Sequence, residues 1–537
     1  MRNSAISMRH SQSSPSVSIE KGTYRIHAPK RSPSKLGYIQ NRHSRLTMHE
    51  KRVAVLIVFL VLATVLCFGF AYYLFTTRWE SYSVRSQGPA SDSPQPLQVV
   101  EFEHDSCSEA GDKSTKYLSY LPHSGFHNQR IALENALVMA HLLDRTLLIP
   151  PVRLGKGIVT YFPFDDLYKL VATSGKDRLS HCANVHSWKS LPVECTEYFE
   201  YTLVSWSWLS NLSSISINQP LLYRWNMSDF WLRDCLGISL NDTFSVKDMS
   251  LYHHRFVDAD PFDMPSARFN DSVSISLLAQ VPHRLLQIGS LFGSSRLRLR
   301  RHHDLEIRAR IRESMVFSNK LFLDIADSIN SSLGGVYLAA HIRLGDWQFI
   351  EKGEKNVRLI WWKLVHDIAG LGKDEAADLE MLVTNSSKVL KPPVYKIDLA
   401  ALRSPIPPLP PVSPRMPTRI ACRGSWHMNP RFAALNAPLF ISTDVSDPFT
   451  NVLLRKFFDT FPCTFVLSDF VDEIAPINLL RSGYDGLMLK EFLLPFLDAI
   501  VAGKAYQLVG TEGSTFSQFV QDVLWRHYHG WEVVQRG

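Results

Sequence analysis

Apolar and polar positions alternate along the chain in two periods, and this pattern predicts strands that are each followed by a helix. In the first such stretch, KYLSY (116–120) and RTLLIP (145–150) are expected strands, and between them Gly125 marks a turn that leads into a helix. In the second, the apolar run 336–340 is an expected buried strand. Beyond residue 418 come three more expected strands, each followed by a helix: APLFIST, CTFVLSD and AYQLVG. Alternation in both halves predicts two parallel-sheet α/β domains that face one another.

Composition gives the boundaries of these domains. We expect an N-terminal Rossmann-like domain at 98–304 and a C-terminal Rossmann-like domain at 305–537. Within the second, residues 390–418 are dense in proline. Proline is unsuited to helix interiors and central strands, so we expect this segment to be a surface insertion.

The N-terminal part of the chain has the pattern of a membrane anchor. Residues 53–75 hold no charged side chain over 23 positions. As a helix they span about 34 Å, enough for a hydrocarbon core of about 30 Å. The preceding residues 1–52 hold eleven Lys and Arg against two Glu, and positive charge favours the cytosolic side. We therefore expect a disordered cytosolic tail (1–52), a transmembrane signal-anchor helix (53–75), a stem (76–97) and a lumenal C-terminal part. These features predict a single-pass type II membrane protein of the Golgi or endoplasmic reticulum.

Charge, sequons and cysteines bear on this prediction. The formal net charge of +7 lies in the tail, so a nucleic-acid partner is not indicated. Six N-x-S/T sequons follow the anchor, at Asn211, Asn226, Asn241, Asn270, Asn330 and Asn385. Six of the seven cysteines also follow it, which predicts disulfides, although six cysteines allow 15 pairings. No Cys/His spacing typical of a structural zinc site appears.

Polar clusters follow four of the expected strands, at 124–130, 341–346, 443–447 and 511–517. Parallel sheets bind ligands at the carboxyl ends of their strands, and the free N–H groups of a helix N-terminus favour an anion. An ordinary crossover turn would also explain the first cluster if it stood alone. The four together predict a ligand site between facing strand ends.

Four segments carry a family resemblance. SGFHNQRIALENALVMAHLLDRTLLIPP, HIRLGDW, FISTDVSDP and GTEGSTFSQFV occur in the order seen in the GDP-fucose protein O-fucosyltransferase superfamily, including its fungal and plant branches. HIRLGDW resembles the superfamily's H-x-R-x-G-D signature, and the resemblance covers roughly residues 115–530. It implies a GT-B fold, in which two Rossmann-like domains face each other across a cleft. The N-terminal domain is then the acceptor side, and the C-terminal domain holds the nucleotide-sugar. The resemblance also implies inverting, metal-independent transfer from GDP-fucose, most often to a Ser or Thr of a protein.

The resemblance and the chemistry of the residues together predict a donor site. Arg343 offers a planar, permanently charged fork for two phosphate oxygens of the departing GDP. Asp346 is expected to orient Arg343 or to accept a hydrogen bond from guanine or ribose, and His341 to contact the nucleotide. The resemblance assigns Asp444 to the nucleotide base. The remaining residues expected at the donor are Gly125, Phe126, Asn128, Arg130, Ser514, Thr515 and Phe516.

The chain departs from the family pattern at two positions. Some members carry a glutamate base where this chain has Ser124, which cannot serve as a carboxylate. His127 has a suitable ordinary pKa for base work. Alternatively, Asn128 positions the acceptor and no dedicated base is used. The second arginine of the signature is Leu344 here, whose side chain is expected to lie away from Arg343. We expect Arg343, Asn128 and His127 to carry the catalysis.

Structural alternatives stand beside these assignments. Asp346 and Arg343 can form a purely architectural pair, and Ser514 and Thr515 can be helix caps. The arginine-rich run 296–310 is expected to be a solvated helix face or a linker.

Three wider questions stay open at this stage. Asp258 and Asp260 have D-x-D spacing, but we expect no metal role for them. The acceptor is a protein or a glycan. The chain can also be a catalytically silent lumenal lectin or scaffold of the same fold.

Overall fold

The computed structural model describes residues 59–68, 97–102, 114–156, 161–185, 190–260, 266–384, 391–395, 409–410 and 420–536. The chain forms two separate units, residues 1–93 and 94–537, and the second contains both sheets described below. Residues 59–68 are helical and exposed. The rest of the expected anchor at 53–75, the tail and nearly all of the stem lie outside the described residues. Among the residues that are described, no helix is both long and apolar enough to cross a bilayer.

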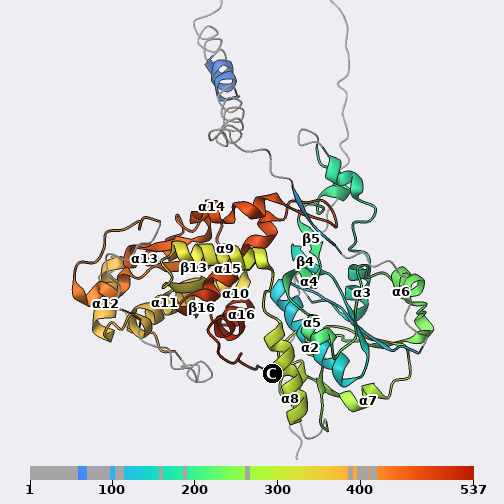
Figure 1. Ribbon diagram of the computed structural model, residues 1–537. Coiled ribbons are helices and arrows are strands. Elements are labelled where there is room, and N and C mark those ends of the chain that lie inside the picture. The colour runs from blue at the N-terminus through green and yellow to red at the C-terminus, as the bar shows by residue number, and fades with distance from the viewer. Residues whose placement is uncertain are drawn as a thin grey trace, which may run out of the picture. The chain divides into compact units, whose positions relative to one another are not determined.

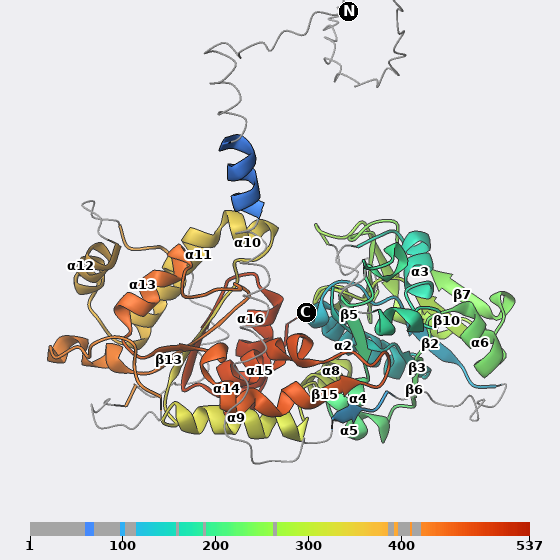
Figure 2. The same ribbon diagram turned by 90° about the horizontal axis from the view of Figure 1, so that it is seen from above.

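The first half of the second unit, cyan and green in Figure 1, is built on a five-stranded parallel sheet whose strands are labelled in Figure 2. Its strand order is β6 (Leu221–Tyr223), β3 (Thr146–Ile149), β2 (Tyr117–Tyr120), β10 (Leu285–Ile288) and β7 (Thr243–Val246). Helix α2 (Phe126–Leu142) connects β2 to β3, so the predicted strand–turn–helix–strand unit is confirmed.

Helix α2 forms because its sequence is rich in alanine and leucine, residues with high helix propensity. Its middle is buried on most sides, from Ala132 to Ala140. The helix ends where Asp144 takes a positive φ of 49°, which turns the chain into β3. Because the middle of α2 is buried, the helix is held in place, and its first turn lies at the edge of the sheet.

The second half is built on a four-stranded parallel sheet ordered β14 (Thr464–Val466), β13 (Leu439–Thr443), β12 (Leu338–Ile342) and β16 (Gln507–Gly510). The expected strand at 336–340 therefore begins two residues later. Helices α9 (Lys320–Ser332) and α15 (Lys490–Lys504) pack against each other beside this sheet, and α11 (Gly353–Trp362) and α13 (Val452–Thr460) belong to its other apolar cluster.

The two halves share contacts at their boundary. Strand β1 (Gln98–Val100) pairs in parallel with β15 (Leu480–Ser482), so the start of the first half lies against the second half. Helix α8 (His302–Ser314) packs on α2, and its Arg312 lies 3.5 Å from the carboxylate of Glu134. Aromatic side chains of both halves join one apolar cluster. Figure 2 shows α16 (Thr515–Phe519) and α2 on facing sides of this boundary.

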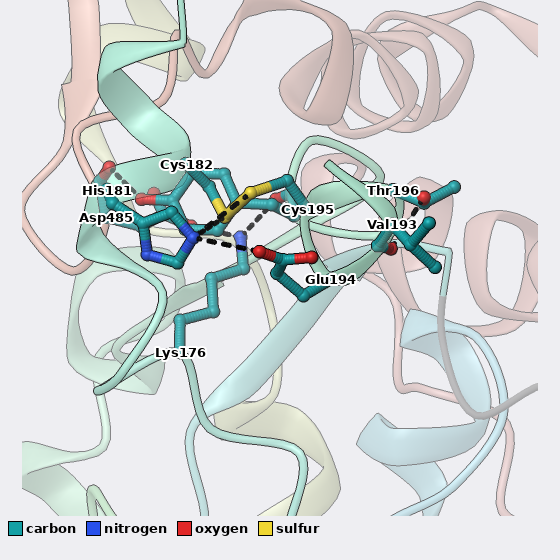
Figure 3. Close-up of a disulfide and its surroundings, with 9 residues drawn as sticks. Lys176, His181, Cys182, Val193, Glu194, Cys195, Thr196 and Asp485 are labelled. Atoms are coloured by element: carbon teal, nitrogen blue, oxygen red, sulfur yellow. Dashed lines mark hydrogen bonds and ion pairs between the residues drawn. A yellow bond between two sulfur atoms is a disulfide. The ribbon is translucent and has the colours of Figure 1, made fainter. Parts of the chain in front are cut away.

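Disulfides were predicted for the part of the chain that follows the anchor, and two are formed with their partners described. Cys182 pairs with Cys195, and Cys422 pairs with Cys463. Figure 3 shows the first pair beside His181, whose Nε2 lies 3.6 Å from both sulfur atoms. Disulfide sulfurs are not thiolate ligands, so this group is not a zinc site. Cys235 is disulfide-bonded as well, and Cys67 is a free, exposed cysteine.

A buried ion pair lies close to the first disulfide and ties the two halves together (Figure 3). The Lys176 ammonium group donates to a carboxylate oxygen of Asp485 at 2.6 Å and to the carbonyl oxygen of Tyr198 at 2.6 Å. Lys176 belongs to the first half and Asp485 to the second, and both side chains are buried. Removing one partner by mutation would leave an uncompensated buried charge in the folded protein.

Candidate functional site

The strand order of the second sheet identifies its binding edge. From β12 the chain adds β13 and then β14 on one side, and later returns to add β16 on the other side. The order therefore reverses between β12 and β16, and open α/β sheets bind ligands in the crevice at such a point. Because all four strands are parallel, the clusters 341–346, 443–447 and 511–517 meet at one edge, as predicted.

Arg343 follows β12 at this crevice. Its Nη2 donates to Asp346 Oδ2 at 2.7 Å and its Nε donates to Asp346 Oδ1 at 3.3 Å. Its backbone N–H donates to Thr511 Oγ1 at 2.9 Å, which ties the end of β12 to the end of β16. The pair considered as an architectural alternative is therefore formed. The Arg343 side chain is still 30% exposed, so an anion can reach the guanidinium.

Asp444 supports the Arg343 loop from the neighbouring strand end. Its two carboxylate oxygens accept the backbone N–H groups of Leu344, at 2.8 Å, and Gly345, at 3.0 Å. A Cβ on Gly345 would lie 2.8 Å from Asp444 Oδ2, so the loop approaches this closely only with glycine there. The Leu344 side chain is buried in the apolar cluster, away from the crevice, as expected. The contacts of Asp444 in this structure are thus with the loop itself.

The loop after β16 leads into α16. Ser514 is the N-cap of α16, and its side chain accepts from the N–H of Ser517 at 3.3 Å. Ser514 is buried, whereas Thr515 is half-buried. The cap considered as an alternative is therefore formed for Ser514. The helix continues without a break through residues 520–525 to α17 (Arg526–Tyr528). As in any helix, the first backbone N–H groups of α16 have no partner within the helix.

His341 lies beneath this loop. Its Nδ1 lies 2.5 Å from Ser517 Oγ, and its ring stacks on Phe516 with 4.2 Å between the ring centroids. Burial, and then the charge of Arg343, lower the pKa of His341 to about 3, so the ring is neutral at physiological pH. The stacked rings of His341 and Phe516 thus pack beneath Arg343 and the loop that follows β16.

The cluster 124–130 opens α2 in the first half, and its residues divide into two kinds. Gln129 is a structural anchor, because its amide exchanges two hydrogen bonds with the backbone of Arg153, at 2.9 and 3.0 Å. Gly125 is the N-cap of α2 and is exposed. Asn128 is half-buried, and among the described residues its Oδ1 has no hydrogen-bond partner. Asn128 Oδ1 is thus a buried acceptor, Gly125 is exposed at the start of the helix, and Ser124 lines a cavity.

Arg130 was predicted at the donor, and it lies in a buried ion pair. Its Nη1 donates to Glu134 at 3.0 Å, and its guanidinium carbon lies 4.3 Å from the centre of the Phe519 ring. The side chain is 3% exposed. The pair has i, i+4 spacing on α2, and this spacing was the signal in the sequence that we missed. Arg130 therefore ties α2 to α16, and its phosphate contact stays a prediction.

His127 brings the first cluster against the second half. Its ring meets Phe516 edge-on, with 4.8 Å between the ring centroids, and lies 5.2 Å from the Phe519 ring. Burial, followed by the charge of Arg130, holds its pKa well below the ordinary value. The adjacent Phe126 packs on Phe496 of α15 at 4.6 Å. All four predicted clusters are therefore close together.

A cavity separates the α2 turn from helices α15 and α16. Aromatic and apolar side chains dominate its lining, with a few polar groups: Phe126, His127, Arg153, Leu154, Gly155, Phe317, Glu491, Phe492, Pro495, Phe496 and Phe516. The sequence reasoning missed Arg153 and the α15 residues, because single positions in a strand and in an apolar helix carry no motif.

Two other expectations can be compared with the structure. Asp258 uses its carboxylate to accept the backbone N–H groups of Arg300 and Arg301, each at 2.8 Å, in the segment that precedes α8. The solvated face expected at 296–310 is wrong for two of its arginines. Arg296 and Arg308 are buried and donate to backbone carbonyls, because the small sheet of β8 (His254–Val257), β9 (Asp271–Ser274) and β11 (Leu297–Arg298) encloses this segment.

Comparison with known proteins adds a family to this geometry. Residues 117–360 match the family model of GDP-fucose protein O-fucosyltransferase. O-fucosyltransferase 30 of Arabidopsis thaliana is 60% identical over 37 residues, which is 7% of this chain and 7% of that protein. The chain thus aligns with a small part of the curated relative.

Solved structures give a weaker likeness. A crystal structure of POFUT1 in complex with GDP is 11% identical, with 80% of this chain and 98% of that chain covered and a TM-score of 0.35. One of POFUT1 in complex with GDP-fucose is 11% identical, with 78% and 96% covered and a TM-score of 0.32. The family resemblance predicted from four segments is confirmed by the family match, which includes the SGFHNQR and HIRLGDW segments.

Proposed function

We propose, from the match of residues 117–360 to the family model of GDP-fucose protein O-fucosyltransferase, that the protein transfers fucose from GDP-fucose to a hydroxyl group of a protein. The observation that carries this proposal is the position of Arg343. Its partly exposed guanidinium lies at the point where the strand order of the second sheet reverses, within the matched residues.

In this proposal Arg343 stabilises the leaving pyrophosphate. As the bond between fucose C1 and the phosphate oxygen breaks, negative charge grows on the β-phosphate. A fixed hydrogen-bond donor that points at this developing charge commonly lowers the activation barrier by on the order of 3–4 kcal/mol. Asp346 orients the guanidinium, and Asp444 holds the backbone of the loop. The N–H groups at the start of α16 are the second set of donors to the phosphates.

The α2 turn is the proposed acceptor side. Asn128 positions the acceptor hydroxyl, with Gly125 allowing close approach. In this proposal the domains of a GT-B enzyme are residues 98–304 and 305–537. Transfer is inverting and uses no metal ion. A glycan acceptor is the second candidate, and a silent sugar-binding protein is the third.

The proposed topology is type II, in the Golgi or endoplasmic reticulum. It rests on the uncharged segment 53–75, on the disulfides of the C-terminal part, and on exposed sequons at Asn211, Asn241 and Asn270. Protease added to sealed microsomes should remove the tail alone and leave a glycosidase-sensitive fragment. Digestion of the C-terminal part in intact vesicles would show that the topology is reversed.

Binding and turnover of the donor test the enzymatic proposal. GDP and GDP-fucose should raise the melting temperature of the 94–537 unit, because a ligand that binds the folded state stabilises it in proportion to RT ln(1 + [L]/Kd). UDP is the matched control. Release of GDP from GDP-fucose separates an enzyme from a silent binding protein. Stabilisation by GDP without any GDP release would support the silent protein.

A further inference from the structure

The first sheet has its own point of reversal, and a histidine bridges it. From β2 the chain adds β3 and β6 on one side and places β10 on the other. His123 follows β2, and Ser290 follows β10. His123 Nε2 lies 2.6 Å from Ser290 Oγ, and His123 Nδ1 lies 2.7 Å from Ser124 Oγ. The imidazole is thus held between two hydroxyl groups at the edge where a parallel sheet binds its ligand.

Ser124 has a strained backbone beside a cavity. Its φ is 66°, in the left-handed region, which costs a residue with a Cβ about 1–2 kcal/mol. The Gln129 amide holds this conformation by donating to the Ser124 carbonyl at 3.1 Å. Such strain is concentrated at functional sites. The lining of the cavity includes His123, Ser124, Gln129, Arg153, Asp177 and Tyr484.

The surroundings of His123 lower the pKa of its imidazole but leave it able to accept a proton. Burial, followed by the positive charge of Arg296, lowers its pKa to about 4. Tyr161 meets the ring edge-on at 5.9 Å, and Asp248 accepts the backbone N–H of Ser290 at 3.2 Å. The basicity of this imidazole therefore matches that of an ordinary glutamate, whose pKa is about 4.3.

We propose that Ser124 and His123 form a proton relay that deprotonates the acceptor hydroxyl. This inference rests on the proposed fucosyl transfer. The acceptor O–H gives its proton to Ser124 Oγ, and the Ser124 proton moves to His123 Nδ1. The acceptor oxygen forms its bond to fucose C1 as the bond from C1 to the phosphate oxygen breaks, and that electron pair leaves with GDP.

The hydrogen bonds of the relay set its direction. The relay uses the His123 tautomer whose Nε2–H donates to Ser290 Oγ, a hydroxyl that also accepts the N–H of Phe292 at 3.2 Å. Nδ1 is then the free acceptor for the Ser124 proton. Ser124 touches the substrate and is the catalytic residue, whereas His123 acts through it. His127 is three residues away, and its ring is packed against Phe516 and Phe519.

Two acceptors that differ in their need for a base test the relay without knowledge of the natural acceptor. Water must lose a proton when it attacks fucose C1, whereas azide is already an anion. The protein would be the full chain, as wild type, Ser124→Ala and His123→Gln. Ser205→Ala is the control, because Ser205 is also buried and pairs with another serine, Ser207, at 2.6 Å.

The expected result is a selective loss. Hydrolysis of GDP-fucose by Ser124→Ala and His123→Gln should fall about a hundredfold, the usual contribution of a base, while azide transfer and GDP affinity stay near wild type. Wild-type hydrolysis should fall as the pH drops through about 4, and the fall should vanish in His123→Gln.

Other outcomes overturn the relay or the function separately. Loss of water and azide transfer in equal proportion would assign a structural role to both residues. No loss in either variant, or no hydrolysis by a wild type that binds GDP, would also overturn the relay. A wild type that does not bind GDP would instead refute the proposed function.

Discussion

The Arg343 guanidinium donates two hydrogen bonds to one carboxylate, that of Asp346, three residues along the chain. The fork is therefore oriented before any ligand arrives. Asp444 lies 3.8 Å from Nε and adds a second negative charge. An incoming phosphate has to share Arg343 with these carboxylates, which favours a dianionic pyrophosphate over a weaker anion.

Arg343→Ala should weaken GDP binding and reduce turnover roughly a hundredfold or more, the usual weight of one transition-state donor. The melting temperature should change little, because the guanidinium is partly exposed and its ion pairs lie near the surface. On the same preparation, titration calorimetry measures GDP affinity, GDP-release kinetics measure turnover, and thermal unfolding measures the melting temperature.

Two variants sharpen this test. Arg343→Lys should rescue only part of the activity, because an ammonium group cannot reproduce the bidentate fork. Arg455→Ala is the matched control, an arginine on α13 whose side chain is 79% exposed. A stable Arg343→Ala protein with normal GDP affinity and turnover would refute this site.

Asp444→Asn should loosen the Arg343 loop. Both Asp444 oxygens accept backbone N–H groups, and the amide of asparagine would place a donor opposite one of them. Loss of a partly exposed hydrogen bond commonly costs about 0.5–1.5 kcal/mol, so we expect a modestly lower free energy of unfolding and weaker GDP binding together. Denaturant titration measures the first. Asp447→Asn, an exposed acid in the same segment, should change neither. Normal stability of Asp444→Asn would contradict the role of this carboxylate.

The sequence predicted the position of the Arg343 site, because polar clusters directly follow the strands that end there. Strand β12, the loop with Arg343 and the cap at Ser514 all follow from local rules, since apolar runs predict buried strands and a serine before a helix predicts a cap. The parallel order then brings these clusters to one edge.

The sequence did not predict which polar side chains form hydrogen bonds or ion pairs within the protein and are therefore not free to bind a ligand. Asp258 accepts the N–H groups of Arg300 and Arg301 because tertiary packing brings together residues 42 and 43 positions apart. The Arg130–Glu134 pair, by contrast, is one turn apart on α2 and was open to a sequence rule. The His123–Ser290 contact joins residues 167 positions apart, which no local pattern can reveal. The Arg296 side chain is buried because a small sheet closes over it.

Metal removal should leave turnover unchanged. Asp258 was the candidate ligand, and its oxygens already accept the N–H groups of Arg300 and Arg301. GDP release from GDP-fucose should therefore proceed equally in excess EDTA. Asp258→Asn should lower the melting temperature, because a neutral amide accepts the N–H groups of Arg300 and Arg301 more weakly than a carboxylate does, without changing the response to manganese. Loss of activity in EDTA with recovery on adding manganese would assign a metal role to Asp258 and Asp260.

The last prediction concerns Asp498 of α15, a half-buried residue whose carboxylate Oδ1 is buried. Burial raises the pKa of Asp498 to about 8, while a hydrogen bond with Ser442 of β13 opposes the shift. Its Oδ1 has no hydrogen-bond partner among the described residues. In the unfolded chain the carboxyl group ionises near pH 4, so the unfolded state binds fewer protons than the folded state between about pH 4 and 8. Asp498 therefore reduces stability as the pH rises through this window, by roughly 1.4 kcal/mol per pH unit at most.

Asp498→Asn keeps the shape of this side chain and removes its titration. The variant should match wild type near pH 4 and become progressively more stable than wild type up to about pH 8. Denaturant unfolding of the 94–537 unit at several pH values measures the difference. Glu491→Gln is the control, because it removes an exposed carboxylate from the same helix. A difference that is constant with pH would mean that Asp498 is already ionised in the folded protein, with water or an ion supplying the partner that its Oδ1 lacks.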